Sequence, residues 1–239
     1  MKKLILSVIA IASIAFTSCE TDDIVIVGGG TDESLNLAGN VLENRTLTAG
    51  NAYVLNGPMF IKSGATLTIE PGTIIKGEAG TGPNATALII ARGSKIDAQG
   101  TENQPIIFTS EADNIQIGQR VGSSLDNTVN GLWGGLVILG NAPISAANAS
   151  MQIEGIPASN PSGLYGGVLP EDNSGVLKYI SIRHGGANIG EGNELNGLTL
   201  GGVGSSTIIE NIEVVANQDD GVECFGGNVN IENVLIWGV

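Results

Sequence analysis

The sequence is poor in the residues on which many catalytic sites and small secreted folds depend. Its 239 residues include two cysteines and one histidine, too few for a disulfide framework or for the usual ligand set of a zinc site. Aromatic residues make up only 4%, and ten basic side chains stand against 24 acidic ones, for a net charge of −14. So acidic a surface repels phosphate backbones, and nucleic acid is therefore not expected as a partner.

Long apolar runs are also missing, except at the start of the chain. Lys2 and Lys3 precede an apolar stretch, residues 4–16, that would span about 20 Å as a helix, short of the roughly 30 Å core of a membrane. This pattern predicts a cleaved secretory signal over residues 1–18. No later segment is long enough, so no transmembrane helix is expected in the mature chain.

The signal ends in Phe-Thr-Ser-Cys, which resembles the lipobox of bacterial lipoproteins and implies a lipid on Cys19, although Phe16 stands where a leucine is usual. The acidic residues that follow, Glu-Thr-Asp-Asp, resemble the tag of Bacteroidetes-type lipoproteins carried to the outer leaflet of the outer membrane. The resemblance implies a surface-exposed protein with a lipid anchor in the outer membrane. Residues 19–38 then form an acidic, Gly-rich tether. With Cys19 acylated, Cys224 is the one remaining thiol, and we expect it to be a small buried apolar residue.

What the chain does contain, beyond residue 40, is a series of short strands. Runs rich in Ile, Val, Leu and Thr end at Gly, Asn or Pro, and helical periodicity is almost absent. Three of them align without gaps over six positions, with spacings of 32 and 22 residues: 177–182, 209–214 and 231–236. In a weaker pair, Gly64, Leu67 and Ile69 match Gly93, Ile96 and Ala98.

These repeats predict an all-β fold, a right-handed, single-stranded parallel β-helix (β-solenoid) over residues 39–239. In such a fold each coil lies about 4.8 Å above the last, so a given position repeats directly over itself. Asn211 and Asn233 occupy one repeat position and should form an asparagine ladder, while the many glycines supply the positive φ of tight corners. An antiparallel sandwich is less suitable, because runs such as LIIA and LVIL lack a polar alternate face.

Five segments carry a more specific resemblance: GATLTIEPGTIIKG, ALIIARGSKIDAQGT, NQPIIFTS, NGLTLGGVGSS and DDGVECFGGNVNIENV. Together they resemble a largely uncharacterised family of Bacteroidetes-type secreted β-helix lipoproteins of the pectin-lyase-like class. The resemblance implies further coils after Val239, and it implies no settled activity. Three lateral insertions, residues 110–131, 154–175 and 185–197, are long enough to be binding surfaces.

The segment NQDDGVECFGG, residues 217–227, holds the densest group of carboxylates. Asp219, Asp220 and Glu223 could serve a polysaccharide hydrolase as acid and base, or could hold Ca²⁺ through hard oxygen ligands. The spacing matches no calcium-binding loop, and of the polygalacturonase motifs only the aspartate pair is present. The simplest interpretation is a structural corner of Asn, Asp and Gly, with Glu223 pointing to water. We therefore expect no catalytic residue and no cofactor, and keep these three carboxylates as candidate calcium ligands.

Two other residues, His184 and Arg183, have side chains that could take part in chemistry. His184 has no second histidine or cysteine partner, so we interpret it as an exposed or capping residue at a strand end. A lyase would need a base such as Arg183, which the repeat alignment places opposite Val215, on the order of 10 Å or more from Asp219.

The combined expectation is a surface lipoprotein whose β-helix carries non-catalytic carbohydrate-binding or adhesive loops, with a polysaccharide as its ligand. Two alternatives stay open: a polysaccharide lyase or glycoside hydrolase of the pectin-lyase-like fold, and a purely structural surface scaffold.

Overall fold

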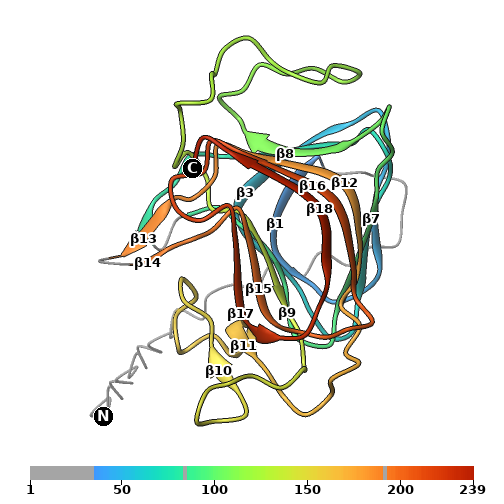
Figure 1. Ribbon diagram of the computed structural model, residues 1–239. Coiled ribbons are helices and arrows are strands. Elements are labelled where there is room, and N and C mark those ends of the chain that lie inside the picture. The colour runs from blue at the N-terminus through green and yellow to red at the C-terminus, as the bar shows by residue number, and fades with distance from the viewer. Residues whose placement is uncertain (1–34, 83–84, 191–192) are drawn as a thin grey trace, which may run out of the picture.

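The structure, a computed structural model, describes residues 35–82, 85–190 and 193–239. The predicted signal, Cys19 and most of the tether lie outside these residues. In the described part of the chain, fourteen strands join into one parallel sheet that winds around a single core (Figure 1). No helix in these ranges is long and apolar enough to cross a membrane.

The strands stack on three faces, which we name A, B and C. Face A holds β2 (Arg45–Leu47), β4 (Thr66–Ile69), β7 (Lys95–Gln99) and the first parts of β12 (Gly175–Arg183), β16 (Ile208–Val215) and β18 (Ile231–Trp237). Face B holds the first part of β3 (Ala52–Ile61), β5 (Ile74–Gly77), β8 (Ile106–Ser110) and the later parts of β12, β16 and β18. Face C holds the rest of β3, β6 (Leu88–Ile90), β9 (Leu136–Leu139), β15 (Leu198–Val203) and β17 (Val222–Gly227).

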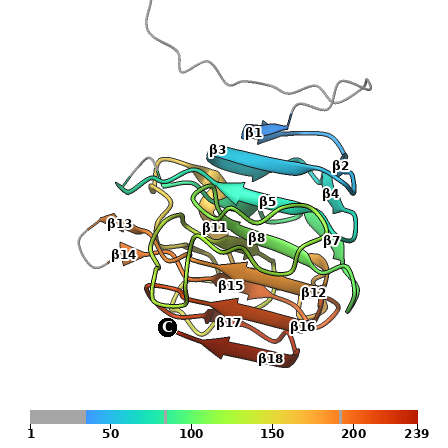
Figure 2. The same cartoon turned by 90° about the horizontal axis from the view of Figure 1, so that it is seen from above.

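The first strand, β1 (Asn36–Val41), lies along β3, and from there the coils follow one another to β18 at the other end of the stack (Figure 2). Two antiparallel pairs stand outside the stack: β10 (Met151–Gln152) with β11 (Leu164–Tyr165), and β13 (Asn188–Gly190) with β14 (Asn193–Glu194). A short 3₁₀ helix, η2 (Pro161–Gly163), precedes β11. The fold is thus the predicted parallel β-helix.

The register confirms the predicted repeats. Leu177 pairs with Ile209, and Ile209 with Ile231, so the three aligned segments lie directly above one another. The weaker early repeat is confirmed as well, because Leu67 pairs with Ile96 and Ile69 with Ala98. These inward-facing positions are fully buried, except for Ile231 in the last coil, which is partly buried.

The predicted asparagine ladder occupies the corner between faces A and B. Asn211 and Asn233 both have positive φ, 58° and 57°, and the Asn233 Nδ2 donates a hydrogen bond of 3.2 Å to the Asn211 Oδ1. Tyr179 stands at the same corner one coil earlier, with φ 50°. Asparagine tolerates this left-handed conformation better than most residues, which explains its use at a corner that must turn in one residue.

Two predictions about residues 217–227 were wrong. The segment is not one corner: the turn ends near Gly221, and Val222–Gly227 forms β17, whose residues pair with Leu198–Val203 of β15. Cys224 is exposed rather than buried. It lies opposite the core residue Leu200, but β17 pairs only with β15, so no strand covers the other side of Cys224 in the described residues.

Candidate functional site

A polar groove of about 620 Å³ lies between face B and the loop after β8. That loop, residues 111–135, leads to β9, contains most of the first predicted insertion, and stands over β8, β12 and β16 (Figure 1). We call this hollow the groove and residues 111–131 the groove loop.

Two outward columns of side chains contribute to the floor of the groove, and all of their members except Leu235 line it. Because side chains alternate along a strand, the residues between the buried core positions of face B point outward. Register places Ser181, Glu213 and Leu235 in one column. It places Arg183, Val215 and Trp237 in the other, which confirms the predicted pairing of Arg183 with Val215.

Arg183 joins the floor to the loop. Its Nε donates to Ser181 Oγ at 2.7 Å, its Nη1 donates to the backbone oxygen of Arg120 at 2.7 Å, and its Nη2 lies 3.5 Å from Glu213 Oε2. Ser181 Oγ in turn donates to Glu213 Oε2 at 2.5 Å. A planar guanidinium with several N–H groups held by fixed acceptors is a positioning group rather than a free base. This geometry gives no support to the alternative in which Arg183 is the base of a lyase.

The groove loop is held by its own polar side chains. The Asn114 Oδ1 accepts hydrogen bonds from the backbone N–H groups of Ser123 and Ser124, which closes the loop on itself. At the first end of the loop, buried Asp113 accepts from Thr109 Oγ1 at 2.9 Å and from the N–H of Ile115 at 3.0 Å. These hydrogen bonds give the loop a defined structure, so it can form one wall of the groove.

His184 anchors the far end of this wall. It is 5% exposed, so the prediction of an exposed residue was wrong, and the capping alternative describes it better. Its Nδ1 lies 2.6 Å from the backbone oxygen of Val129, and its own backbone oxygen accepts from the N–H of Leu132. Its burial follows from the loop folding over the strand end, which no repeat in the sequence encodes.

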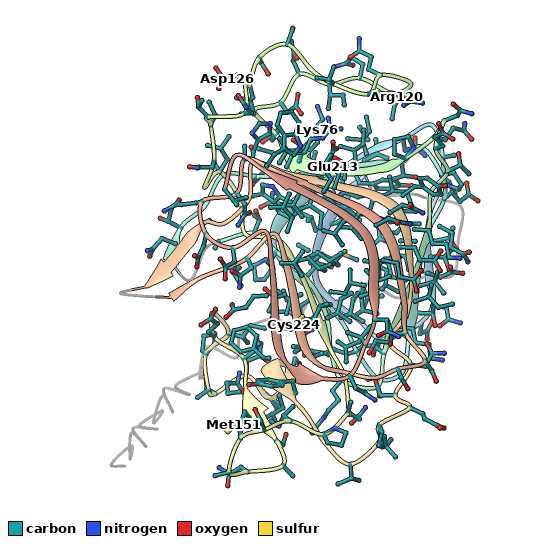
Figure 3. The ribbon with its side chains drawn as sticks, viewed as in Figure 1. Lys76, Arg120, Asp126, Met151, Glu213 and Cys224 are labelled. Carbon is teal, nitrogen blue, oxygen red and sulfur yellow. The ribbon has the colours of Figure 1, made fainter. Side chains whose placement is uncertain are left out.

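Two aromatic rings line the groove at separate positions along the strands. Tyr179 is 36% exposed and Trp237 is 46% exposed, and both belong to its lining. Four positions along a strand and two coils separate them, so their Cα atoms are on the order of 15 Å apart. The lining also includes the carboxylates of Asp126 and Glu213 and the amides of Asn127 and Asn211. Figure 3 shows Arg120 and Asp126 on the loop above Glu213 and Lys76.

A second hollow, of about 400 Å³, lies between the outer side of face C and residues 152–158. It is lined mainly by apolar groups, with Phe60, Ile89 and Ile153 among them. Its amide, Gln152, already donates to the backbone oxygens of Ile156, Pro157 and Asn160. This hollow therefore offers a ligand few directed hydrogen bonds, and the polar groove is the better candidate site.

The predicted calcium ligands do not line the groove; they lie in or just after the turn that leads from face B to face C. Asp219 and Asp220 are exposed in the turn before β17, whereas Glu223 lies within β17, where its Oε2 accepts a 2.6 Å hydrogen bond from Asn196 Nδ2. Among the described residues, no three His, Cys, Asp or Glu side chains are grouped as metal ligands. Calcium binding by these three residues stays a prediction, which a Ca²⁺ titration of the chain and of Asp219→Asn can test.

The sequence pointed to the insertion 110–131 as a possible binding surface, but of the residues that line the groove it singled out only Arg183 and His184 in connection with chemistry. Tyr179 carried a usable signal, because it aligns with the ladder asparagines while being far larger than they are. Trp237 also carried a usable sequence signal, since it follows the third repeat at the position equivalent to Arg183. Glu213 lies within a repeat, but nothing in the sequence showed that the loop would enclose it.

The fold and the groove define the class: a parallel β-helix with a polar groove on one outer face, bounded by a lateral loop. Residues 39–239 match the family described as the pectate-lyase like beta helix domain, and the chain belongs to that family. Comparisons with curated proteins and with solved structures gave no significant match.

Proposed function

We propose that the protein is a non-catalytic carbohydrate-binding protein and that the groove holds the saccharide. One observation carries the proposal: two half-exposed aromatic rings line a hollow whose other lining side chains include carboxylates and amides. Aromatic faces pack against the apolar faces of sugar rings, and planar polar groups exchange hydrogen bonds with sugar hydroxyls. The 620 Å³ of the groove is within the range of small-molecule sites.

The arrangement of Arg183 and Glu213 favours binding over catalysis. Hydrolysis needs an acid and a base facing a shared substrate, and lyase chemistry needs a base that is free to take a proton. Here the two charged groups are paired with each other and with Ser181. They support the wall of the groove.

Affinity measurements with the two ring variants test the proposal. On a panel of plant, algal and host polysaccharides, Trp237→Ala should weaken binding about tenfold, which corresponds to roughly 1.4 kcal/mol. Tyr179→Ala should also weaken it. Leu169→Ala, which removes an exposed apolar side chain on another loop, is the matched control and should bind normally. Unchanged affinity in both ring variants, or no retention of the unmodified protein on any polysaccharide, would reject the groove as the site.

The cellular location belongs to the same proposal. A lipid on Cys19 would hold the β-helix at the outer face of the outer membrane, within reach of environmental polysaccharides. Incorporation of a labelled fatty acid into the chain, lost in Cys19→Ala, tests this part. Incubation of the protein with each retained polysaccharide tests the enzyme alternative, which requires release of reducing or unsaturated sugars.

A further inference from the structure

We infer that the groove selects an uncharged saccharide chain over one that carries carboxylate or sulfate groups; this inference rests on the proposed function. It starts from the charges that line the groove. The lining includes the carboxylates of Glu102, Asp126 and Glu213, whereas its guanidinium groups are those of Arg120 and Arg183. Asp113 adds a fourth carboxylate, buried beneath the loop.

Both arginines already serve the protein's own acceptors. Arg183 donates to Ser181 and to the backbone of Arg120 and pairs with Glu213. Arg120 donates from Nη2 to the backbone oxygen of Glu102 at 2.9 Å and to Asn103 Oδ1 at 3.3 Å. These contacts leave an anionic sugar only the remaining N–H groups of the two guanidiniums, which lie among the carboxylates of the lining. The nearby ammonium of Lys76 is also engaged, because its Nζ donates to the backbone oxygen of Asp113 at 2.7 Å.

The carboxyl of Asp126, on the groove loop, is held toward its charged form. Thr128 donates from its hydroxyl and from its backbone N–H to Asp126 Oδ1, which keeps the pKa of this carboxyl below its ordinary value of 3.8. Asp126 and Glu102 are both exposed. Repulsion across a groove of this size is only partly screened, because the Debye length is about 8 Å at physiological ionic strength. The net charge of −14 acts in the same direction over longer distances.

A neutral saccharide meets no such penalty. Its hydroxyl groups donate well to Asp126 and Glu213, since hydrogen bonds to charged acceptors are stronger than those between neutral groups. The amides of Asn127 and Asn211 can both donate and accept. The carboxylates that repel an acidic chain are thus the acceptors that bind a neutral one.

A matched pair of polymers tests the inference. Polygalacturonate and alginate are each compared with the same polymer after chemical reduction of its carboxyl groups to alcohols, with EDTA present so that no divalent cation bridges the charges. The reduced form of at least one should bind at least about tenfold tighter, and the gap should narrow as salt is added. Equal or tighter binding of the acidic forms overturns the inference while leaving the groove as a saccharide site. If neither form binds and neutral glucans, mannans and galactans also fail, the proposed function falls and the inference falls with it.

A charge variant links the selectivity to the groove itself. Glu102→Lys should raise the affinity for the acidic polymer several-fold, in a salt-dependent manner, and should reduce the preference for the neutral form. Glu171→Lys makes the same change of charge at an exposed position outside the groove and should leave the preference intact. An equal effect of both variants would assign the selectivity to net charge rather than to the groove, and would contradict the inference.

Discussion

Individual residues at the corner between faces A and B adopt an unfavourable backbone conformation, and contacts between stacked coils offset its cost. Tyr179, Asn211 and Asn233 all adopt positive φ, a region that costs an ordinary L-residue about 1–2 kcal/mol. Asparagine reduces that cost, and the hydrogen bond from Asn233 to Asn211 adds about 1 kcal/mol. The ladder therefore stabilises a corner that the chain must turn in every later coil.

Asn211→Ala should lower the free energy of unfolding by about 2 kcal/mol, because alanine loses the ladder hydrogen bond and bears the full cost of positive φ. Asn211→Gly loses the same hydrogen bond but fits the backbone, so it should be the milder change. Urea unfolding followed by circular dichroism gives both values. A glycine variant less stable than the alanine variant would show that the backbone conformation is not the main factor.

Cys224 provides a second test at the scale of the residue. Partial burial, followed by the charge of the adjacent Glu223, raises the pKa of its thiol above the ordinary value of 9.0. Although the side chain is exposed, it should therefore be alkylated slowly at neutral pH and faster as the pH rises, because the thiolate is the reactive form. Peptide mapping after iodoacetamide treatment measures the rate at this position. Glu223→Gln removes one cause of the raised pKa and should accelerate labelling; an unchanged rate would exclude that contribution.

Among the elements, the strands and the groove loop differ in how far the sequence predicts them. Stacked strands repeat a pattern of burial, so the segments around Leu177, Ile209 and Ile231 were alignable in advance, register included. β17 was missed because its residues, VECFGG, lack the alternating aliphatic pattern, and only pairing with β15 makes them a strand. The groove loop shows no repeating sequence pattern either. It is held by contacts such as those of Asn114, whose partners nine and ten residues away follow no repeat.

The groove loop should depend on the fork geometry of Arg183. In Arg183→Lys the positive charge stays, but one ammonium cannot reach Ser181, Glu213 and the backbone of Arg120 together. We expect faster proteolysis within residues 111–131, weaker saccharide binding and little change in global unfolding. Limited proteolysis with mapped cleavage sites checks the first expectation. Lys178→Arg, an exchange at an ion pair on face A, is the control. If Arg183→Lys is cleaved no faster than the control, the arginine does not hold the loop.

At the scale of the whole molecule, the β-helix is a one-dimensional stack in which each coil rests on its neighbours. One continuous column of inward side chains runs through face A, and its members are Leu47, Ile69, Ala98, Leu177, Ile209 and Ile231. Most of this column is fully buried, but Ile231 in the last coil is only partly so. In such a stack, stability is a sum of coil and interface contributions, so the effect of a substitution depends on its place along the axis.

Matched truncations in this column test the stack directly. Leu177→Ala, with coils on both sides, should cost about 2–5 kcal/mol, because the surrounding strands cannot collapse into the space. Ile231→Ala should cost less, about 1–2 kcal/mol, since part of that side chain already meets water. Urea midpoints and slopes for the two variants give the comparison. The slope for Leu177→Ala should also fall if the stack separates there and loses its cooperativity. Equal losses of unfolding free energy at the two positions would mean that the last coil is covered as completely as the middle one. The side of β18 that faces away from β16 would then have to be covered in solution.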